Sequence, residues 1–160
     1  MNSIDAPLVI VTTALADERA GCLVGFHSQS GIDPHRYSVW LSKANHTYLL
    51  GLRARYLSVH FLASADLALA EVFGTRCSVE TDKFAGLDIE TDERGIPLLR
   101  GCQNRLVLER IAVLDDGGDH VCLTTRVVSA QSEGEFTPLR VSDAEHLEPN
   151  HPAEGRAQSL

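Results

Sequence analysis

Short segments of β-type sequence, each followed by a turn or loop signal, recur along most of this chain. Segment 56–62, "YLSVHFL", alternates between two faces, and segment 8–14, "LVIVTTA", is rich in β-branched residues. The sequence "DDGGD" separates two more such segments, 105–114 and 120–131, and is a strong hairpin signal. Further strands are predicted at 22–28, 37–42 and 136–142. This pattern excludes a regularly alternating βαβ sheet.

Two segments have the apolar spacing of a helix. The first spans about 45–55 and the second spans 64–74. The predicted apolar face of the first helix carries Tyr48, Leu49 and Leu52. Residues 75–97 are polar and are predicted to be irregular. Many short strands with two helices among them predict a mainly β (α+β) protein, an antiparallel barrel with short helical insertions.

Length and charge exclude several classes of protein. The chain has 160 residues, enough for one domain with a buried core, and a net charge of −8. Nucleic acids and anionic lipids attract basic surfaces, so this charge argues against both as partners. No apolar run approaches the roughly 20 residues that span a bilayer, and the N-terminus lacks the basic start of a signal peptide. We expect a cytoplasmic protein with one domain over 1–145 and a polar tail over 146–160.

The cysteines and histidines lack the spacing of a metal site or of a catalytic triad. The cysteines lie far apart without a CxxC pair, and we expect reduced, partly buried thiols at Cys22, Cys77, Cys102 and Cys122. Ser28 and Ser30 lie near His27, but adjacency along the chain does not make a triad. No cysteine or carboxylate stands at ligand spacing from His27, His35, His46, His60, His146 or His151. We therefore predict neither a metal centre nor a protein nucleophile.

A run of small or basic polar residues, "SKANHT", lies between the strand at 37–42 and the helix that follows. Asn45 is a suitable N-cap, and Thr47 adds a hydroxyl group in the first turn. Lys43 supplies a full charge and His46 a titratable donor. Together these groups are suited to holding a phosphate monoester. A merely capped helix with solvated polar neighbours explains the same residues and stays open at this point.

Five motifs occur in an order that is typical of one known family. They are "PLVIVTTA", "GCLVGFHSQSGIDPHRYSVWLSKANHTYLL", "DKFAGL", "IPLLRGC" and "GDHVCLTTRVVSAQ" with "TPL" after it. The arrangement resembles the flavin reductase-like, FMN-binding split-barrel family, and the C-terminal segment resembles that of its actinobacterial members. The resemblance implies a homodimer that binds FMN, less often FAD, and reduces it with NADH or NADPH. The reduced flavin would then supply a flavin-dependent monooxygenase.

The resemblance also implies which residues contact the flavin. The segment "SKANHT" corresponds to the part that binds the flavin phosphate, with Lys43, Asn45, His46 and Thr47. The segment "GFHSQS" corresponds to the part along the isoalloxazine ring and ribityl chain, with Gly25, Phe26, His27, Ser28, Gln29 and Ser30. Lys83 in "DKFAG" corresponds to the mouth of the cofactor site. His120 in "GDH" corresponds to a contact with the pyridine nucleotide, and a solvated turn histidine is the alternative.

Two further functions stay open. The last strand of well-studied members carries aromatic residues after "PL", whereas "PLRVSD" has none. This difference favours a flavin-binding module without efficient turnover, which would serve in storage, in sensing or as a subunit. A deazaflavin-dependent oxidoreductase is a third possibility. In the first hypothesis the flavin accepts the hydride itself, so the protein needs no catalytic residue of its own.

Overall fold

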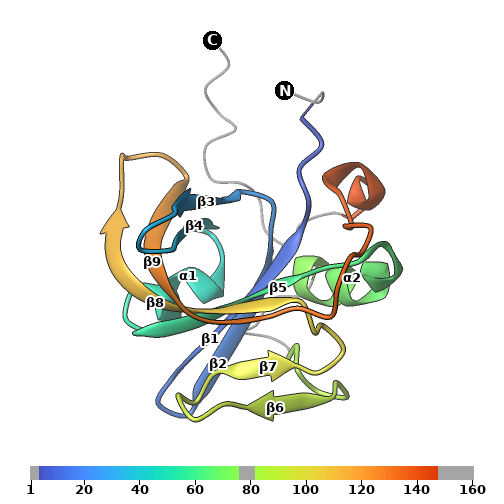
Figure 1. The fold of residues 1–160 in the computed structure, drawn as a ribbon, viewed down its shortest axis with the longest axis horizontal. Helices are drawn as coiled ribbons and strands as arrows, with labels where there is room; N and C mark the ends of the chain where they lie inside the picture. The colour runs from blue at the N-terminus through green and yellow to red at the C-terminus, as the bar shows by residue number, and fades with distance from the viewer. Residues whose placement is uncertain (1–3, 76–81, 148–160) are drawn as a thin grey trace.

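The computed structural model describes residues 4–75 and 82–147. Among these residues, seven strands form one antiparallel sheet in the order β2-β1-β5-β8-β9-β4-β3, which curls into a half-barrel (Figure 1). The strands are β1 (Val9–Leu15), β2 (Glu18–Val24), β3 (His27–Gly31), β4 (Arg36–Ser42), β5 (Tyr56–Phe61), β8 (Arg105–Leu114) and β9 (His120–Gln131). A separate hairpin consists of β6 (Ile89–Thr91) and β7 (Pro97–Leu99).

The helical elements of the described residues are short. They are α1 (His46–Gly51), the 3₁₀ helix η1 (Ser64–Asp66), α2 (Leu67–Thr75) and the 3₁₀ helix η2 (Val141–Ala144). Helix α1 packs against β1 and β2, while α2 packs against β2 and η2. The structure therefore confirms the predicted antiparallel split barrel with short helical insertions.

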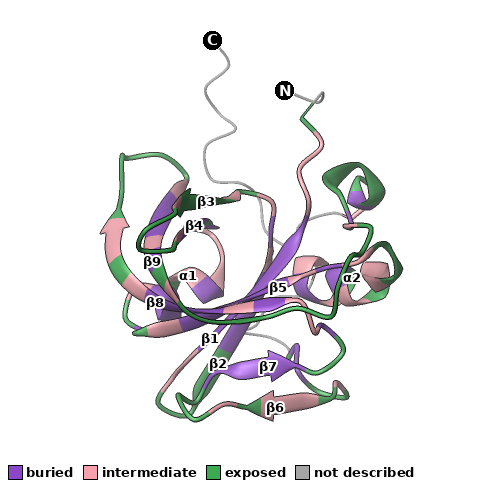
Figure 2. Ribbon diagram, viewed as in Figure 1, coloured by how far each residue is buried: buried purple, intermediate pink, exposed green. Residues whose placement is uncertain are grey.

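Strand β1 is buried on both faces (Figure 2). Its alternate residues Val9 and Val11 belong to the apolar core inside the half-barrel, together with residues of β2, β4, β5, β8 and β9. Ile10 points the other way, into a second core that includes Phe73 of α2. Each such side chain contributes roughly 1.5–3 kcal/mol by leaving water. Helix α2 thus covers the second face of the sheet, and β1 lies between the two apolar cores.

His60 is fully buried and connects three strands. Its Nδ1 lies 3.3 Å from the carbonyl oxygen of Ile10, and its Nε2 accepts a hydrogen bond from the Leu99 backbone N–H at 3.1 Å. The ring is therefore a neutral tautomer with its proton on Nδ1. Burial lowers the pKa of His60 to about 3, with Arg105 contributing in the same direction. This histidine holds the β6–β7 hairpin against β1 and β5.

The strand predicted at 22–28 is wrong in its bounds. Strand β2 begins at Glu18 and ends at Val24, and β3 starts at His27 after a short break. Strand β3 is a polar strand at the edge of the sheet, so its sequence has no apolar alternation that could reveal it.

The strand predicted at 136–142 is also wrong. Pro138 and Arg140 form isolated bridges with Ala63 and Pro7, and η2 follows. Proline has no N–H to donate, which limits regular pairing here. The region 75–97, predicted to be irregular, contains β6 and the start of β7.

The first helix is shorter than the predicted span of 45–55, because α1 ends at Gly51. Its predicted apolar face is partly wrong, since 54% of Leu49 is exposed while Thr47 and Leu50 are buried. Packing against β1 and β2 determines which face is covered, and the short helix has too few turns for spacing alone to show it.

Three of the four cysteines, Cys22, Cys102 and Cys122, are free and buried, as predicted. Cys77 and the tail from residue 148 lie outside the described residues, so the predicted domain boundary stays a prediction. Within the described ranges, no helix has the length and apolar character to cross a membrane.

Candidate functional site

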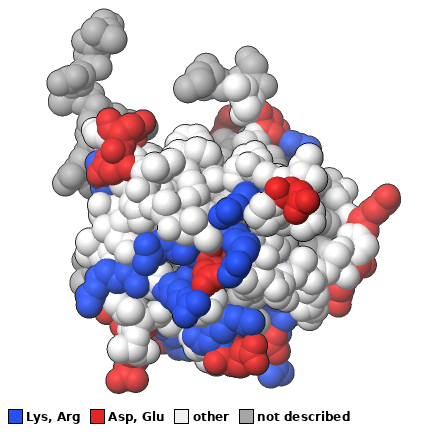
Figure 3. Space-filling view, turned by 60° about the vertical axis from the view of Figure 1, so that its left-hand side comes forward, with Lys and Arg blue, Asp and Glu red and all other residues white. Residues whose placement is uncertain are grey.

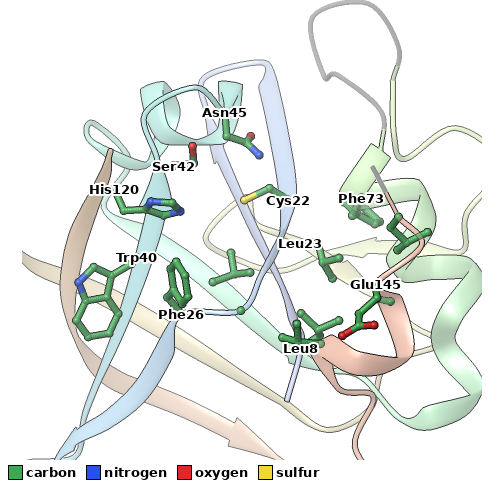
Figure 4. A pocket seen from close by; sticks show the side chains of 16 residues that line it. Leu8, Cys22, Leu23, Phe26, Trp40, Ser42, Asn45, Phe73, His120 and Glu145 are labelled. Carbon is green, nitrogen blue, oxygen red and sulfur yellow. The ribbon is translucent and has the colours of Figure 1, made fainter. Parts of the chain in front are cut away.

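A cavity of about 430 Å³ opens where β2, β4 and the C-terminal segment meet (Figure 4). Its lining is mostly apolar, with a few polar groups at one side, which is the usual character of a small-molecule site. The lining residues are Leu8, Cys22, Leu23, Val24, Gly25, Phe26, Trp40, Ser42, Asn45, Phe73, Gly74, His120, Val141, Ala144, Glu145 and Leu147.

Strand β2 supplies one side of the cavity through Cys22, Leu23 and Val24. Burial raises the pKa of the Cys22 thiol to about 11, although Lys83 acts in the opposite direction. A thiol with so high a pKa stays protonated near neutral pH and is a poor nucleophile. Cys22 therefore contributes packing surface to the cavity.

Aromatic side chains line the side of the cavity opposite to β2. Phe26 is 61% exposed and Trp40 is 36% exposed, which is unusual for large apolar side chains. The His120 ring meets Phe26 edge to face, with 5.1 Å between ring centroids. Figure 4 shows Phe26, Trp40 and His120 side by side, away from Leu8 and Glu145. Such rings offer flat surfaces to a flat ligand.

Three polar side chains, Ser42, Asn45 and His120, lie at one end of the cavity. The Asn45 side-chain oxygen accepts a hydrogen bond from the Thr47 N–H at 3.0 Å and so caps α1. The Nδ1 atom of His120 lies 2.8 Å from Oδ1 of Asp119. If Nδ1 carries the proton, the neutral ring offers Nε2 to a ligand as an acceptor.

The C-terminal segment forms the remaining wall, through Val141, Ala144, Glu145 and Leu147. It is held beside the N-terminal segment, because the Leu8 N–H donates to the Leu139 carbonyl at 2.7 Å. None of these wall residues is among the site residues predicted from the sequence. Local patterns do not show that the two ends of the described chain meet, and only the "TPL" motif lay close to this wall.

Two of the six residues predicted along the ring of the ligand, Gly25 and Phe26, line the cavity. The other four, His27, Ser28, Gln29 and Ser30, lie on β3 and do not line it. His27 lies between two partners, with Nδ1 at 2.7 Å from the Tyr37 hydroxyl and Nε2 at 2.8 Å from the Pro7 carbonyl oxygen. Burial lowers its pKa. His27 thus connects β3 to the segment before β1.

The hydroxyl and amide groups of β3 form local contacts. Ser38 Oγ donates to Ser30 Oγ at 2.9 Å, and Ser28 Oγ donates to the Gln29 carbonyl at 2.9 Å. Ser28, Gln29 and Ser30 are exposed at the edge of the sheet. A ligand that reached them would extend out of the cavity along this edge.

The predicted phosphate-binding residues surround the start of α1. Of these, Asn45 lines the cavity. The Lys43 ammonium group pairs with Asp115 at 2.8 Å, which raises the pKa of Lys43, and His46 Nε2 lies 2.5 Å from Glu18. Both side chains therefore already have a carboxylate partner, which a bound anion would have to replace.

Thr47 is fully buried, and its hydroxyl faces the Cys22 thiol without a well-formed hydrogen bond. Its backbone N–H is used by the cap from Asn45. In this structure the Thr47 hydroxyl therefore does not reach the surface where a phosphate would lie.

Lys83 is also buried, at 3% exposure. Its ammonium group donates to the carbonyl oxygens of Gly21 at 3.0 Å and Phe73 at 3.1 Å. It thus joins β2 to α2 immediately behind two cavity-lining residues, Cys22 and Phe73, and does not itself line the cavity.

Basic side chains gather on one face of this acidic protein, around a single acidic group (Figure 3). Arg55 and Arg126 both donate to Glu109, whose pKa is lowered first by the hydrogen bond from Arg55. In the ladder between β4 and β9, Arg126 stands opposite Arg36 at one end, whereas His120 stands opposite Ser42 at the other end. This ion-paired cluster is therefore separate from the cavity.

The cavity can bind a flat, largely apolar molecule with one polar edge. The described residues contain no group of three or more side chains that could hold a metal ion. Ser42, Cys22 and His120 line the cavity, but no side-chain hydrogen bond joins one to another among the contacts of the described residues.

Comparison with known proteins gives one family and one fold. The model of the "Flavin reductase like domain" matches residues 1–145. No curated protein matches the chain. An FMN-binding protein from Thermus thermophilus, solved with bound p-hydroxybenzaldehyde, is 25% identical with a TM-score of 0.75, over 82% of this chain and 74% of that one.

Two further solved structures share the fold. An NADH:FAD oxidoreductase from Streptomyces globisporus is 18% identical with a TM-score of 0.76, over 86% of this chain and 81% of that one. A Sinorhizobium meliloti protein is 20% identical with a TM-score of 0.77 over 86% of this chain, which spans only 46% of that protein.

Proposed function

This chain belongs to the flavin reductase-like domain family, and we propose that it binds a flavin, FMN or FAD, and reduces it with NADH or NADPH. One observation carries the proposal. The cavity joins exposed aromatic surface at Phe26 and Trp40 to a polar end at Ser42 and Asn45, with Lys43 next in the chain. The order of these surfaces matches the three parts of a flavin nucleotide, which are a flat ring, a polar ribityl chain and an anionic phosphate.

The residues of the cavity fit a flavin in their chemistry. A bound flavin would supply the hydride-accepting group, which the protein lacks. Phe26 and Trp40 would hold the ring and exclude water from one side, while Ser42 and Asn45 would hydrogen-bond to polar atoms. Lys43 and His46 would orient the phosphate, and each would then exchange its carboxylate, Asp115 or Glu18, for a phosphate oxygen.

His120 would hold the pyridine nucleotide against the exposed side of the ring. It lies at the start of β9, directly across from Ser42 of β4, so the sheet fixes its backbone. Its contact with Phe26 fixes the ring orientation. The role of the chain in this reaction is to bind and orient two substrates, because positioning alone lowers the barrier of a bimolecular transfer.

A second function is favoured by the composition of the C-terminal wall. Val141 and Ala144 line the cavity there, and neither can stack on a nicotinamide ring. A flavin-binding module without efficient turnover, serving in storage, in sensing or as a subunit, would have this property. In that case His120 would contact only the flavin or solvent.

The oligomeric state, the cellular location and the partner of the protein are part of the same proposal. We expect a homodimer in the cytoplasm that passes reduced flavin to a flavin-dependent monooxygenase. These statements depend on membership of the family, whose model matches residues 1–145.

The experiment titrates the purified protein with FMN, FAD and riboflavin and then mixes the flavin complex anaerobically with NADH or NADPH. The proposal expects saturable binding, and bleaching of the flavin absorption that depends on the concentration of the pyridine nucleotide. Binding without bleaching would support the module without turnover. A protein that binds none of the three flavins would refute both functions.

A further inference from the structure

The outer wall of the cavity is built where the N-terminal and C-terminal segments meet, and we propose that Asp5 is a positioning residue that holds this wall. By fixing the wall, Asp5 sets how tightly the cavity retains a flavin. The inference rests on the proposed function, because it concerns the same cavity.

Asp5 holds the start of η2 through both its side chain and its backbone. Its Oδ1 accepts from the Ser142 N–H at 2.9 Å, and its Oδ2 accepts from the Ser142 hydroxyl at 2.8 Å. Its carbonyl oxygen accepts from Arg140 Nη1 at 2.7 Å. The hydrogen bonds from Ser142 lower the pKa of Asp5. The ionised carboxylate is therefore the form that makes this contact near neutral pH.

The N-terminal and C-terminal segments are joined by an isolated bridge between Pro7 and Arg140, and their backbone hydrogen bonds end shortly before Ser142. The Leu8 N–H donates to Leu139 at 2.7 Å, and the Val141 N–H donates to Ala6 at 3.0 Å. Beyond Val141 the chain turns into η2, a 3₁₀ helix of four residues. So short a 3₁₀ helix has poor intrinsic stability, so its placement depends on what anchors it. Ala144 packs into the second apolar core, and Asp5 adds the polar anchor at Ser142.

The anchored segment stands directly over the cavity. Val141 and Ala144 line the cavity on either side of Ser142, and Leu8 lines it from the N-terminal segment. A Cβ atom placed at Gly25 would lie 3.6 Å from Val141 and 3.7 Å from Leu8, so the wall is in van der Waals reach of the β2–β3 connection. Loss of the Asp5 contact would let the wall move away from Gly25 and admit water to the cavity.

Figure 4 shows Glu145 of the wall away from Asn45, one of the predicted phosphate-binding residues, and this separation distinguishes the effect of the wall from theirs. Val141 and Ala144 are apolar and face the part of the cavity that includes Leu8 and Gly25. A disturbed wall should therefore weaken FMN and riboflavin equally, since both carry the same ring. A change at Lys43 should weaken FMN alone.

The test compares Asp5→Ala and Ser142→Ala with the matched control Glu135→Ala, an exposed carboxylate in the connection before the wall. Flavin dissociation constants are measured by fluorescence titration with FMN and riboflavin. Amide hydrogen exchange of residues 139–147 is measured on the same proteins without ligand. Asp5→Asn, which keeps one acceptor oxygen, serves as the conservative variant.

We expect Asp5→Ala to weaken both flavins by about five- to thirtyfold and to speed exchange in 139–147, with β8 and β9 unchanged. Ser142→Ala should weaken them by about two- to fivefold, because its backbone N–H contact survives. Asp5→Asn should recover part of the loss, and Glu135→Ala should match the wild type.

Wild-type flavin affinity in both Asp5→Ala and Ser142→Ala would overturn the inference and leave the proposed function standing. Faster exchange throughout the barrel would also overturn it, since it would show general destabilisation. A wild-type protein that binds neither flavin would instead overturn the proposed function and the ligand part of the inference. If Asp5→Ala leaves the amide exchange of residues 139–147 unchanged, Asp5 does not anchor the wall.

Discussion

Among the residues that the structure describes, His120 is the one histidine that lines the candidate cavity, and His120→Ala removes its ring. When Nδ1 donates to Asp119, Nε2 can accept from the carboxamide N–H of a nicotinamide. One such hydrogen bond contributes about 0.5–1.5 kcal/mol, and a contact between the imidazole and the nicotinamide ring would add a similar amount. Because the side chain is 29% exposed, we take the lower part of that range, about 1–2 kcal/mol in total.

This loss corresponds to a fall of about five- to thirtyfold in kcat/KM for NADH or NADPH. Stopped-flow reduction of the flavin complex over a range of NADH concentrations measures it, and titration measures the flavin affinity separately. His35→Ala is the matched control, because His35 is an exposed histidine between β3 and β4 that does not line this cavity.

The loss of kcat/KM in His120→Ala should come from weaker binding of the pyridine nucleotide. Flavin affinity should change by no more than about twofold in His120→Ala, the range of an ordinary surface substitution. If reduction is as fast as in the wild type, His120 is a solvated turn residue. If flavin affinity and reduction fall together, the ring contacts the flavin and not the second substrate.

Three other predictions test the site, the core and the assembly. Lys43→Met should weaken FMN by about tenfold and leave riboflavin unchanged, whereas Thr47→Val should alter neither, because its hydroxyl is buried. Equal losses of FMN and riboflavin in Lys43→Met would place the phosphate elsewhere. The lowered pKa of His60, about 3, means that the unfolded chain binds a proton here below about pH 6.5 while the folded chain does not. The free energy of unfolding should therefore fall with decreasing pH by up to about 1.4 kcal/mol per unit, and urea titrations of His60→Gln should lack that part of the slope. Light scattering at micromolar concentration should give the mass of two 17.4 kDa chains, and a single-chain mass with flavin bound would contradict the homodimer.

The sequence predicted the fold well where apolar residues alternate. Strands β1, β5, β8 and β9 carry enough apolar or β-branched residues for their pattern to be read directly. Strand β3, "HSQSG", carries none, because an edge strand facing water has no core to fill. The segment at 136–142 has a strand-like sequence, but its few pairings are isolated bridges, which no local pattern can distinguish from a ladder.

The candidate site was predictable in residue type and less so in geometry. Gly25, Phe26, Asn45 and His120 do line the cavity. The sequence could not show that Lys43 would be paired with Asp115, since that contact joins two distant loops. The C-terminal wall was missed for the same reason. Contacts between segments far apart in the chain are set by the completed fold.

The pairing of β4 with β9 has a consequence for the order in which the molecule acquires its cavity. Strands β1–β2, β3–β4 and β8–β9 are hairpins between neighbours in sequence, whereas β4 meets β9 only after a long loop has closed. Such closures are entropically costly and slow. The cavity draws on β2, β4 and β9 and is therefore incomplete until this pairing forms. A ligand of the cavity should then act mainly by slowing unfolding, with little effect on the rate of folding.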